Sequence, residues 1–107
     1  WFVKARETDT MVIQRSIRNA ARVIKNKAAE KALSMEERGV SLEELLTVIS
    51  GLMGQKALLE GDLDGGIIAC GQCVGLIQEI KSVKEVIEDI IQGAQSILRK
   101  LNNMMES

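Results

Sequence analysis

The sequence predicts an all-α fold with a short extended segment near its N-terminus. None of the 107 residues is proline, although average usage would place roughly five in a chain of this length. Because domains with many loops usually contain proline, its absence favours helices joined by short connections. Aromatic residues make up only 2% of the chain, so the core must consist of aliphatic side chains, which suit helix packing.

Residues 1–19 are predicted to form an extended region that leads into a helical domain. Residues Trp1–Arg6 fit the end of a helix and include the only two aromatic side chains of the chain. The following residues Thr8–Ile17 are rich in β-branched side chains and contain no glycine, which is typical of a strand. An isolated strand is unstable, so this strand needs a partner from elsewhere.

Residues 20–81 are predicted to form the helical domain. Asn19 is expected to cap its first helix, Ala20–Glu37, in which apolar residues recur at helical spacing. Gly39 then fits the left-handed backbone position that commonly follows a helix end.

A second helix is predicted to start at Ser41, because Glu44 three residues later completes a capping box. This helix is expected to end at Gly51, and one or two further helical turns over Gln55–Glu60 are expected to close at Gly61. The buried stripe of the second helix is expected to consist of Leu42, Leu45, Leu46 and Ile49.

The segment Glu60–Ile80 is the most unusual part of the chain, since it contains five of the nine glycines and both cysteines among apolar residues. Small residues in an apolar run indicate that a neighbouring helix or a ligand approaches the backbone closely. We expect Gly66–Ile77 to form a helix that is capped by Asp62 or Asp64. Its glycines lower the helix propensity by about 1 kcal/mol each relative to alanine, so tertiary packing must compensate.

Residues 82–107 are predicted to form a long amphipathic closing helix. Ser82 and Glu85 form a second capping box, and acidic residues precede basic ones along the helix, as the helix dipole favours. Apolar side chains recur at three- and four-residue steps over roughly 30 Å: Val83, Val86, Ile87, Ile90, Ile91, Ala94, Ile97, Leu98 and Leu101.

The composition excludes several classes of function. The chain has no histidine, so it has no imidazole for general base catalysis or for a Ser-His or Cys-His pair. Two cysteines without histidine also make a zinc site improbable. A net charge of -1 gives no global field that would attract nucleic acid. No apolar run reaches the roughly 20 residues of a membrane span.

Cys70 and Cys73 have the C-x-x-C spacing of redox-active dithiols, but the strand-to-helix setting of thioredoxin-like proteins is missing. Apolar neighbours raise a thiol pKa and make the thiol less reactive. The sequence therefore favours small buried packing residues over a redox dithiol. Gly71 and Gly75 would share one face of a helix, which permits a close neighbour or a ligand edge.

Two segments together resemble the nitronate monooxygenase family, once called 2-nitropropane dioxygenases. The first is ARETDTMVIQRSIRNAARVIKNKAAE, in which a Thr-Asp-Thr stretch leads into Arg-x-x-Arg-Asn. The second is EGDLDGGIIACGQCVGLIQEIKSVKEVIEDI, with its acidic-glycine start, its Gly-Gln pair and its Ser-Val-capped final helix. The two segments occur in the order expected for the family and cover nearly the whole chain.

The resemblance implies an FMN-dependent (β/α)₈-barrel oxidoreductase with a helical substrate-binding domain near its C-terminus. Such enzymes oxidise alkyl nitronates with molecular oxygen. The flavin-phosphate glycines and the catalytic histidine would lie upstream in the barrel, and residues 1–19 would form the end of the barrel region and a linker. The chain begins without Met and has no signal pattern, so we expect a piece of a longer, cytoplasmic protein that is inactive alone and binds no FMN unaided.

By the same resemblance, Gly71 and Gln72 would contact the flavin, and Gln72, Cys73 and Gly75 would contact the substrate. The stretch Arg15–Asn19 would line the cleft between the helical domain and the barrel. Expected partners are that barrel, a small-molecule substrate and further copies of the chain, since a detached piece exposes apolar surface. Three alternatives stay open: a related FMN-dependent enoyl reductase, a stand-alone helical interaction module and a dithiol redox protein.

Overall fold

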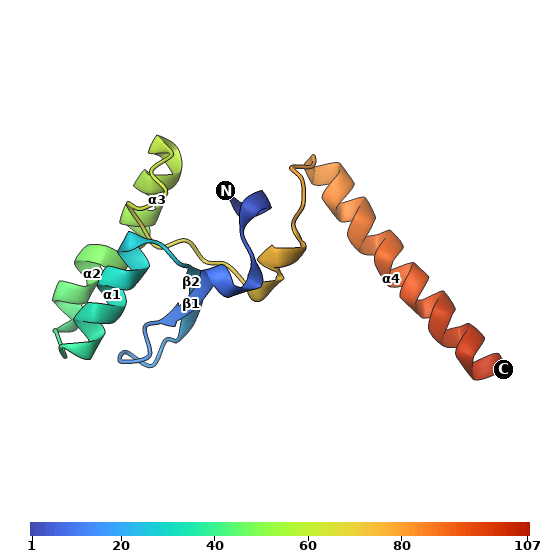
Figure 1. Ribbon diagram of the computed structural model, residues 1–107, viewed down its shortest axis with the longest axis horizontal. Helices are drawn as coiled ribbons and strands as arrows, with labels where there is room; N and C mark the ends of the chain where they lie inside the picture. Colours follow the sequence, from blue (N-terminus) through green and yellow to red (C-terminus); the bar gives the residue numbers. More distant parts are fainter.

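The chain folds into a small mixed body from which a long C-terminal helix projects (Figure 1). The computed structural model describes all 107 residues, which extend over 59 × 30 × 20 Å. The chain forms three 3-10 helices, Phe2–Lys4, Glu7–Asp9 and Gln72–Leu76, and the strands β1 (Thr10–Ile13) and β2 (Ala21–Ile24). Its α-helices are α1 (Lys27–Glu37), α2 (Leu42–Ile49), α3 (Gly51–Glu60) and α4 (Val83–Glu106). The fold is therefore mostly helical, but the all-α prediction is wrong at this small two-stranded sheet.

The expected N-terminal strand is present but shorter than the predicted Thr8–Ile17, because Glu7–Asp9 is a 3-10 helix and residues 15–18 form a turn. Its partner is the segment that follows it. β1 pairs with β2 in antiparallel register, with Thr10 opposite Ile24 and Ile13 opposite Ala21. Gln14 and Arg18 take left-handed backbone angles, with φ of 65° and 56°, in the hairpin loop between the strands. This pairing satisfies the backbone groups that an isolated strand would leave open.

The prediction that Asn19 caps a helix over Ala20–Glu37 is wrong in its first part. Residues Ala21–Ile24 form β2, where the β-branched side chains of Val23 and Ile24 favour extended backbone. Helix α1 begins only at Lys27, and its cap is Asn26, whose side-chain oxygen accepts a hydrogen bond from the Ala29 N–H at 2.8 Å. Gly39 does follow the helix in the left-handed region, at φ 70°.

Helix α2 begins as predicted, with the Ser41–Glu44 capping box formed in both directions. Its buried side chains are Leu45 and Val48, whereas Leu42 is 53% exposed and Leu46 45% exposed. The expected stripe is thus wrong at these two leucines, because α2 packs against α1 along only one edge of its apolar face.

The sequence predicted that Gly51 ends α2, and this prediction is wrong. Ser50 ends α2 and also precedes α3, so that Gly51 is the first residue of the next helix. The predicted closure at Gly61 is confirmed, since this residue follows α3 with φ 70° and its N–H bonds to the Ala57 carbonyl.

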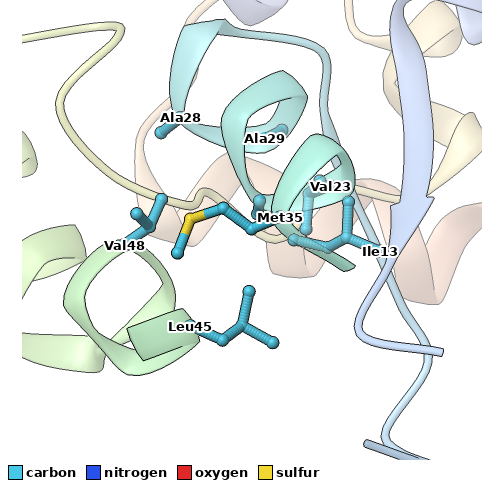
Figure 2. Close-up of a cluster of buried hydrophobic side chains, with 8 residues drawn as sticks. Ile13, Val23, Ala28, Ala29, Met35, Leu45 and Val48 are labelled. Atoms are coloured by element: carbon cyan, nitrogen blue, oxygen red, sulfur yellow. The ribbon is translucent and has the colours of Figure 1, made fainter. Parts of the chain in front are cut away.

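A cluster of eight buried residues joins the two strands to α1 and α2 (Figure 2). The short side chains that α1 contributes let the hairpin and α2 approach it closely, and larger residues of the strands and of α2 fill the remaining space. The members are Ile13, Val23, Ala28, Ala29, Ala32, Met35, Leu45 and Val48.

The glycine-rich segment does not form the predicted helix over Gly66–Ile77. Its residues 67–70 run extended along β2, where the Ile24 N–H bonds to the Ile68 carbonyl at 3.0 Å and the Cys70 N–H to the Arg22 carbonyl at 3.2 Å. The free edge of β2 offers these backbone partners, whereas a helix with this many glycines would be weak.

The two aspartates at the start of this segment do not cap a helix there, contrary to the prediction. Asp64 instead accepts a hydrogen bond from the Lys27 N–H at 3.0 Å, at the start of α1. The side chain of Asp62 accepts one from the N–H of Asp64 at 3.0 Å and so shapes the turn after α3.

Helix α4 begins with the predicted Ser82–Glu85 capping box and runs for 24 residues. It buries no side chain against the rest of the chain. Its exposed apolar residues, which we call the apolar face of α4, are Val83, Val86, Ile87, Ile90, Ile91, Ile97, Leu98, Leu101, Met104 and Met105. None of the helices has the length and apolar composition needed to cross a lipid bilayer.

Candidate functional site

The candidate site is the turn Gly71–Leu76, which we call the site turn. The pairing of residues 67–70 with β2 fixes the chain just before it, and Val74, only 1% exposed, anchors it from within. The Val74 N–H donates to the Gly71 carbonyl at 3.1 Å and closes the turn. The backbone of the site turn is therefore held from both sides, while its other side chains face outward.

All four residues that the resemblance assigns to the site lie in this turn. Gly71, Gln72, Cys73 and Gly75 are all exposed. A glutamine side chain has both donor and acceptor atoms, so the exposed amide of Gln72 can bind either kind of polar group. The site turn thus presents one amide and one thiol next to two positions that lack side chains.

Gly71 and Gly75 do not share a face of an α-helix, because the site turn is a 3-10 helix that begins after Gly71. The close neighbour of Gly75 is the chain itself. A Cβ added at Gly75 would lie 2.8 Å from Oε2 and 3.0 Å from the backbone nitrogen of Glu7. Glycine is needed here so that the N-terminal segment can pack against the turn.

The prediction that both cysteines are buried packing residues is wrong for Cys73, which is exposed, whereas Cys70 is half-buried. The two thiols are free. Burial raises the pKa of the Cys70 thiol above its usual value, and the nearby Cys73 adds to this shift. At neutral pH, Cys70 is therefore less often a thiolate than an ordinary exposed cysteine.

The hairpin loop that contains Arg15–Asn19 is held by a single carboxylate from α1. Glu36 accepts hydrogen bonds from the Gln14 N–H at 2.8 Å, the Ser16 N–H at 2.9 Å and the Ser16 hydroxyl at 2.7 Å. Burial opposes the charged form, but these bonds together lower the pKa of Glu36 below its usual value. The loop is thereby fixed to α1, at the end of the hairpin away from the site turn (Figure 1).

An apolar groove of about 420 Å³, which no motif of the sequence predicts, borders the site turn. Ile68 and Ile77, which lie just before and just after the turn, contribute to its wall. The only hint in the sequence was the pair of aromatic residues at the start of the chain. The groove is lined by Trp1, Phe2, Val3, Leu58, Ile68, Ile77, Glu79 and Ile80.

No three acidic or cysteine side chains in the structure converge on a point where they could hold a metal ion. Two carboxylates border the turn and the groove: that of Glu7 is packed against Gly75, and that of Glu79 lines the groove. The turn and groove together offer an apolar wall with one exposed amide. This arrangement suits the edge of a flat, largely apolar ring with a polar rim better than it suits an anion.

Comparison with known proteins agrees with this description of the fold. The family model described as nitronate monooxygenase matches residues 2–93. The structure of FabK from Thermotoga maritima superposes with a TM-score of 0.77 at 38% identity, over 95% of this chain and 32% of that one. A point mutant of the same protein gives a TM-score of 0.68 at 36% identity, over 95% of this chain and 29% of that one. The chain thus spans about a third of the length of these solved structures.

Proposed function

The chain belongs to the nitronate monooxygenase family, and on this premise we propose that it is the helical part of an FMN-dependent nitronate monooxygenase-like oxidoreductase. The family is one of flavin-dependent oxidoreductases in general. The observation that carries the proposal is the family match over residues 2–93, which contains both the hairpin and the site turn. In this role residues 20–81 cover the substrate and the flavin, and α4 is the final helix, which packs against the barrel.

The site turn is proposed to border the flavin and the substrate. Gly71 allows the ring edge to approach the backbone, and the Gln72 amide donates a hydrogen bond to a polar atom of the ring or the substrate. Cys73 faces the substrate on the same turn, and Gly75 contacts it through its backbone, because Glu7 fills the space that a side chain would take. When bound, FMN supplies the electron transfer, while these residues position the substrate and the groove excludes water from it.

The residues of this chain fit the edge of a flavin but not its phosphate. The carboxylates of Glu7 and Glu79 lie beside the turn and the groove, where they would repel a phosphate dianion. The chain also lacks the histidine that the family uses. We therefore propose that a barrel outside these 107 residues holds the phosphate and performs the proton transfer, so that the chain alone is inactive. The cytoplasmic location stays a prediction.

The function of the site turn is tested by Gln72→Ala in the full-length protein that contains this chain. Loss of the amide should reduce turnover of an alkyl nitronate, measured as oxygen uptake, on the order of tenfold, as expected for one lost hydrogen bond to a reacting molecule. Gln78→Ala, two residues beyond the turn, serves as the matched control. Unchanged kinetics in Gln72→Ala would remove this residue from the site.

A second candidate is the enoyl reductase activity of the related FMN-dependent family. The likeness to FabK at 38% identity is the observation that favours it. Two assays of the same full-length protein distinguish the two candidates. The first supplies an alkyl nitronate and oxygen, and the second supplies an enoyl thioester and a reduced nicotinamide nucleotide. Turnover of the enoyl thioester alone would replace the first proposal with the second.

The apolar face of α4 is proposed to pack against the barrel. Its side chains span an arc wider than about 100° around the helix, which is typical of a helix that packs on a broad body rather than along a narrow seam. In the isolated chain this face has no cover, so copies should associate through it. A stand-alone module that binds a partner's helix would use the same face.

Replacing both Ile90 and Ile97 with lysine should convert the associated chain to monomers, because two buried charges without partners would oppose the contact. Sedimentation velocity measures this change directly. Gln92→Lys with Asn103→Lys adds the same charge on the opposite side of α4 and should leave association intact. A monomeric unsubstituted chain would show that this face drives no self-association.

A further inference from the structure

Cys70 and Cys73 lie against the same residue at the start of the site turn. The Cys70 sulfur lies 3.4 Å from the Gly71 carbonyl oxygen. The Cys73 sulfur would lie 3.1 Å from a Cβ added at Gly71. Gly71 has no side chain, so the Cys73 sulfur can occupy the space that a Cβ would take there. They also differ in access, because Cys73 is exposed and Cys70 is half-buried.

We propose that Cys70 and Cys73 form a redox-sensitive pair that closes to an intramolecular disulfide when the chain meets a low-molecular-weight disulfide. The pair is a modification site of this chain, and it does not depend on the proposed flavin chemistry. The ring that the disulfide closes contains Gly71 and Gln72. Oxidation would therefore fix the backbone of the residue that carries the exposed amide.

The reaction proceeds by two thiol–disulfide exchanges. The exposed Cys73 thiolate attacks one sulfur of the small disulfide, forms a mixed disulfide and releases one small thiolate. The Cys70 thiolate then attacks the Cys73 sulfur, forms the Cys70–Cys73 bond and releases the second small thiolate. Two electrons pass from the protein to the small disulfide, which is reduced to two thiols, and the protein releases the two thiol protons.

The two cysteines have distinct parts in this sequence. Cys73 reacts first because it is exposed and because a thiolate must reach the incoming disulfide. The pKa of Cys70 is raised by its burial and by the nearby Cys73, so Cys70 is a poor first nucleophile near neutral pH. Once Cys73 carries the mixed disulfide, the Cys70 thiol has its target sulfur close by. This proximity compensates for the low thiolate fraction of Cys70.

The test uses the 107-residue chain and oxidised glutathione, followed by mass spectrometry and thiol counting. The chain should lose both free thiols and the mass of two hydrogen atoms, without forming a covalent dimer. Cys70→Ser should stop at the Cys73–glutathione mixed disulfide. Cys73→Ser should form its mixed disulfide more slowly than Cys70→Ser does, because the half-buried Cys70 thiol is less accessible and its raised pKa lowers its thiolate fraction.

Two results would overturn the proposal. The first is a chain that keeps both thiols, or only the mixed disulfide, after equilibration with a large excess of oxidised over reduced glutathione. The second is oxidation that yields only disulfides between chains. Equal rates for the two single variants would overturn the assigned order of attack.

Discussion

Asn26→Ala is expected to destabilise the folded body by roughly 3 kcal/mol, because three hydrogen bonds at a buried position are lost together. Asn26 is 6% exposed. Its oxygen caps α1 through the Ala29 N–H, and its amide nitrogen donates to the carbonyls of Leu63 at 3.0 Å and Gly66 at 2.9 Å. Urea unfolding followed by circular dichroism should show a lower midpoint with an unchanged slope.

Asn26→Asp separates the two roles of this side chain. Aspartate can still accept the hydrogen bond from the Ala29 N–H, but it has no N–H group for the two carbonyls and places a negative charge beside them. It should therefore recover the cap and remain clearly less stable than the unsubstituted chain. Asn19→Ala, in the exposed hairpin loop, should change the stability by less than about 1 kcal/mol. Full stability in Asn26→Asp would show that the loop bonds contribute nothing.

Elements whose signals are local could be predicted from the sequence. The capping boxes at Ser41 and Ser82 need only a serine and a glutamate three residues apart, and both are formed. Gly39 is predicted in the left-handed region just past a helix end, and Gly61 is predicted to close a helix; both have φ 70°. These interactions close within one helical turn, so tertiary contacts rarely override them.

The errors arose where distant contacts decide the structure. Val23 and Ile24 fit a helical pattern, but pairing with β1 on one side and with residues 67–70 on the other holds them extended. The true cap Asn26 has partners 37 and 40 residues away in the sequence. Gln14 and Arg18 turn the hairpin with left-handed backbone and no glycine, so no turn signal marked the strand that follows.

The candidate site could be predicted only in part, and for a similar reason. The site turn is one contiguous stretch, so its four residues were certain to lie together once it was singled out. The apolar groove beside it combines the chain start, Leu58 of α3 and residues that flank the turn, and no local pattern predicts that assembly. The chemistry assigned to the turn came from the family resemblance, because an exposed amide by itself is compatible with many ligands.

The second large effect is expected at Gly66, which is buried against the backbone of α3. A Cβ added at Gly66 would lie 2.7 Å from the Met53 carbonyl oxygen, 2.8 Å from the Gly54 Cα and 2.9 Å from the Gly54 nitrogen. These are backbone atoms of a helix, so they cannot rotate away as a side chain would. The close approach that the glycine-rich segment predicted is thus made here by a neighbouring helix.

Gly66→Ala should therefore cost about 3 kcal/mol, at the upper end of the usual cost of overpacking, because α3 must shift or the loop must leave it. Gly93→Ala is the matched control. Gly93 lies in exposed α4 with nothing within 4 Å of the added Cβ. Alanine at this position should stabilise the helix by up to about 1 kcal/mol. The same substitution should thus lower the urea midpoint at one glycine and strengthen the helix at the other. Equal small effects at both positions would show that α3 moves away from the loop without strain. The contact between Gly66 and Gly54 would then not hold the glycine-rich segment in place.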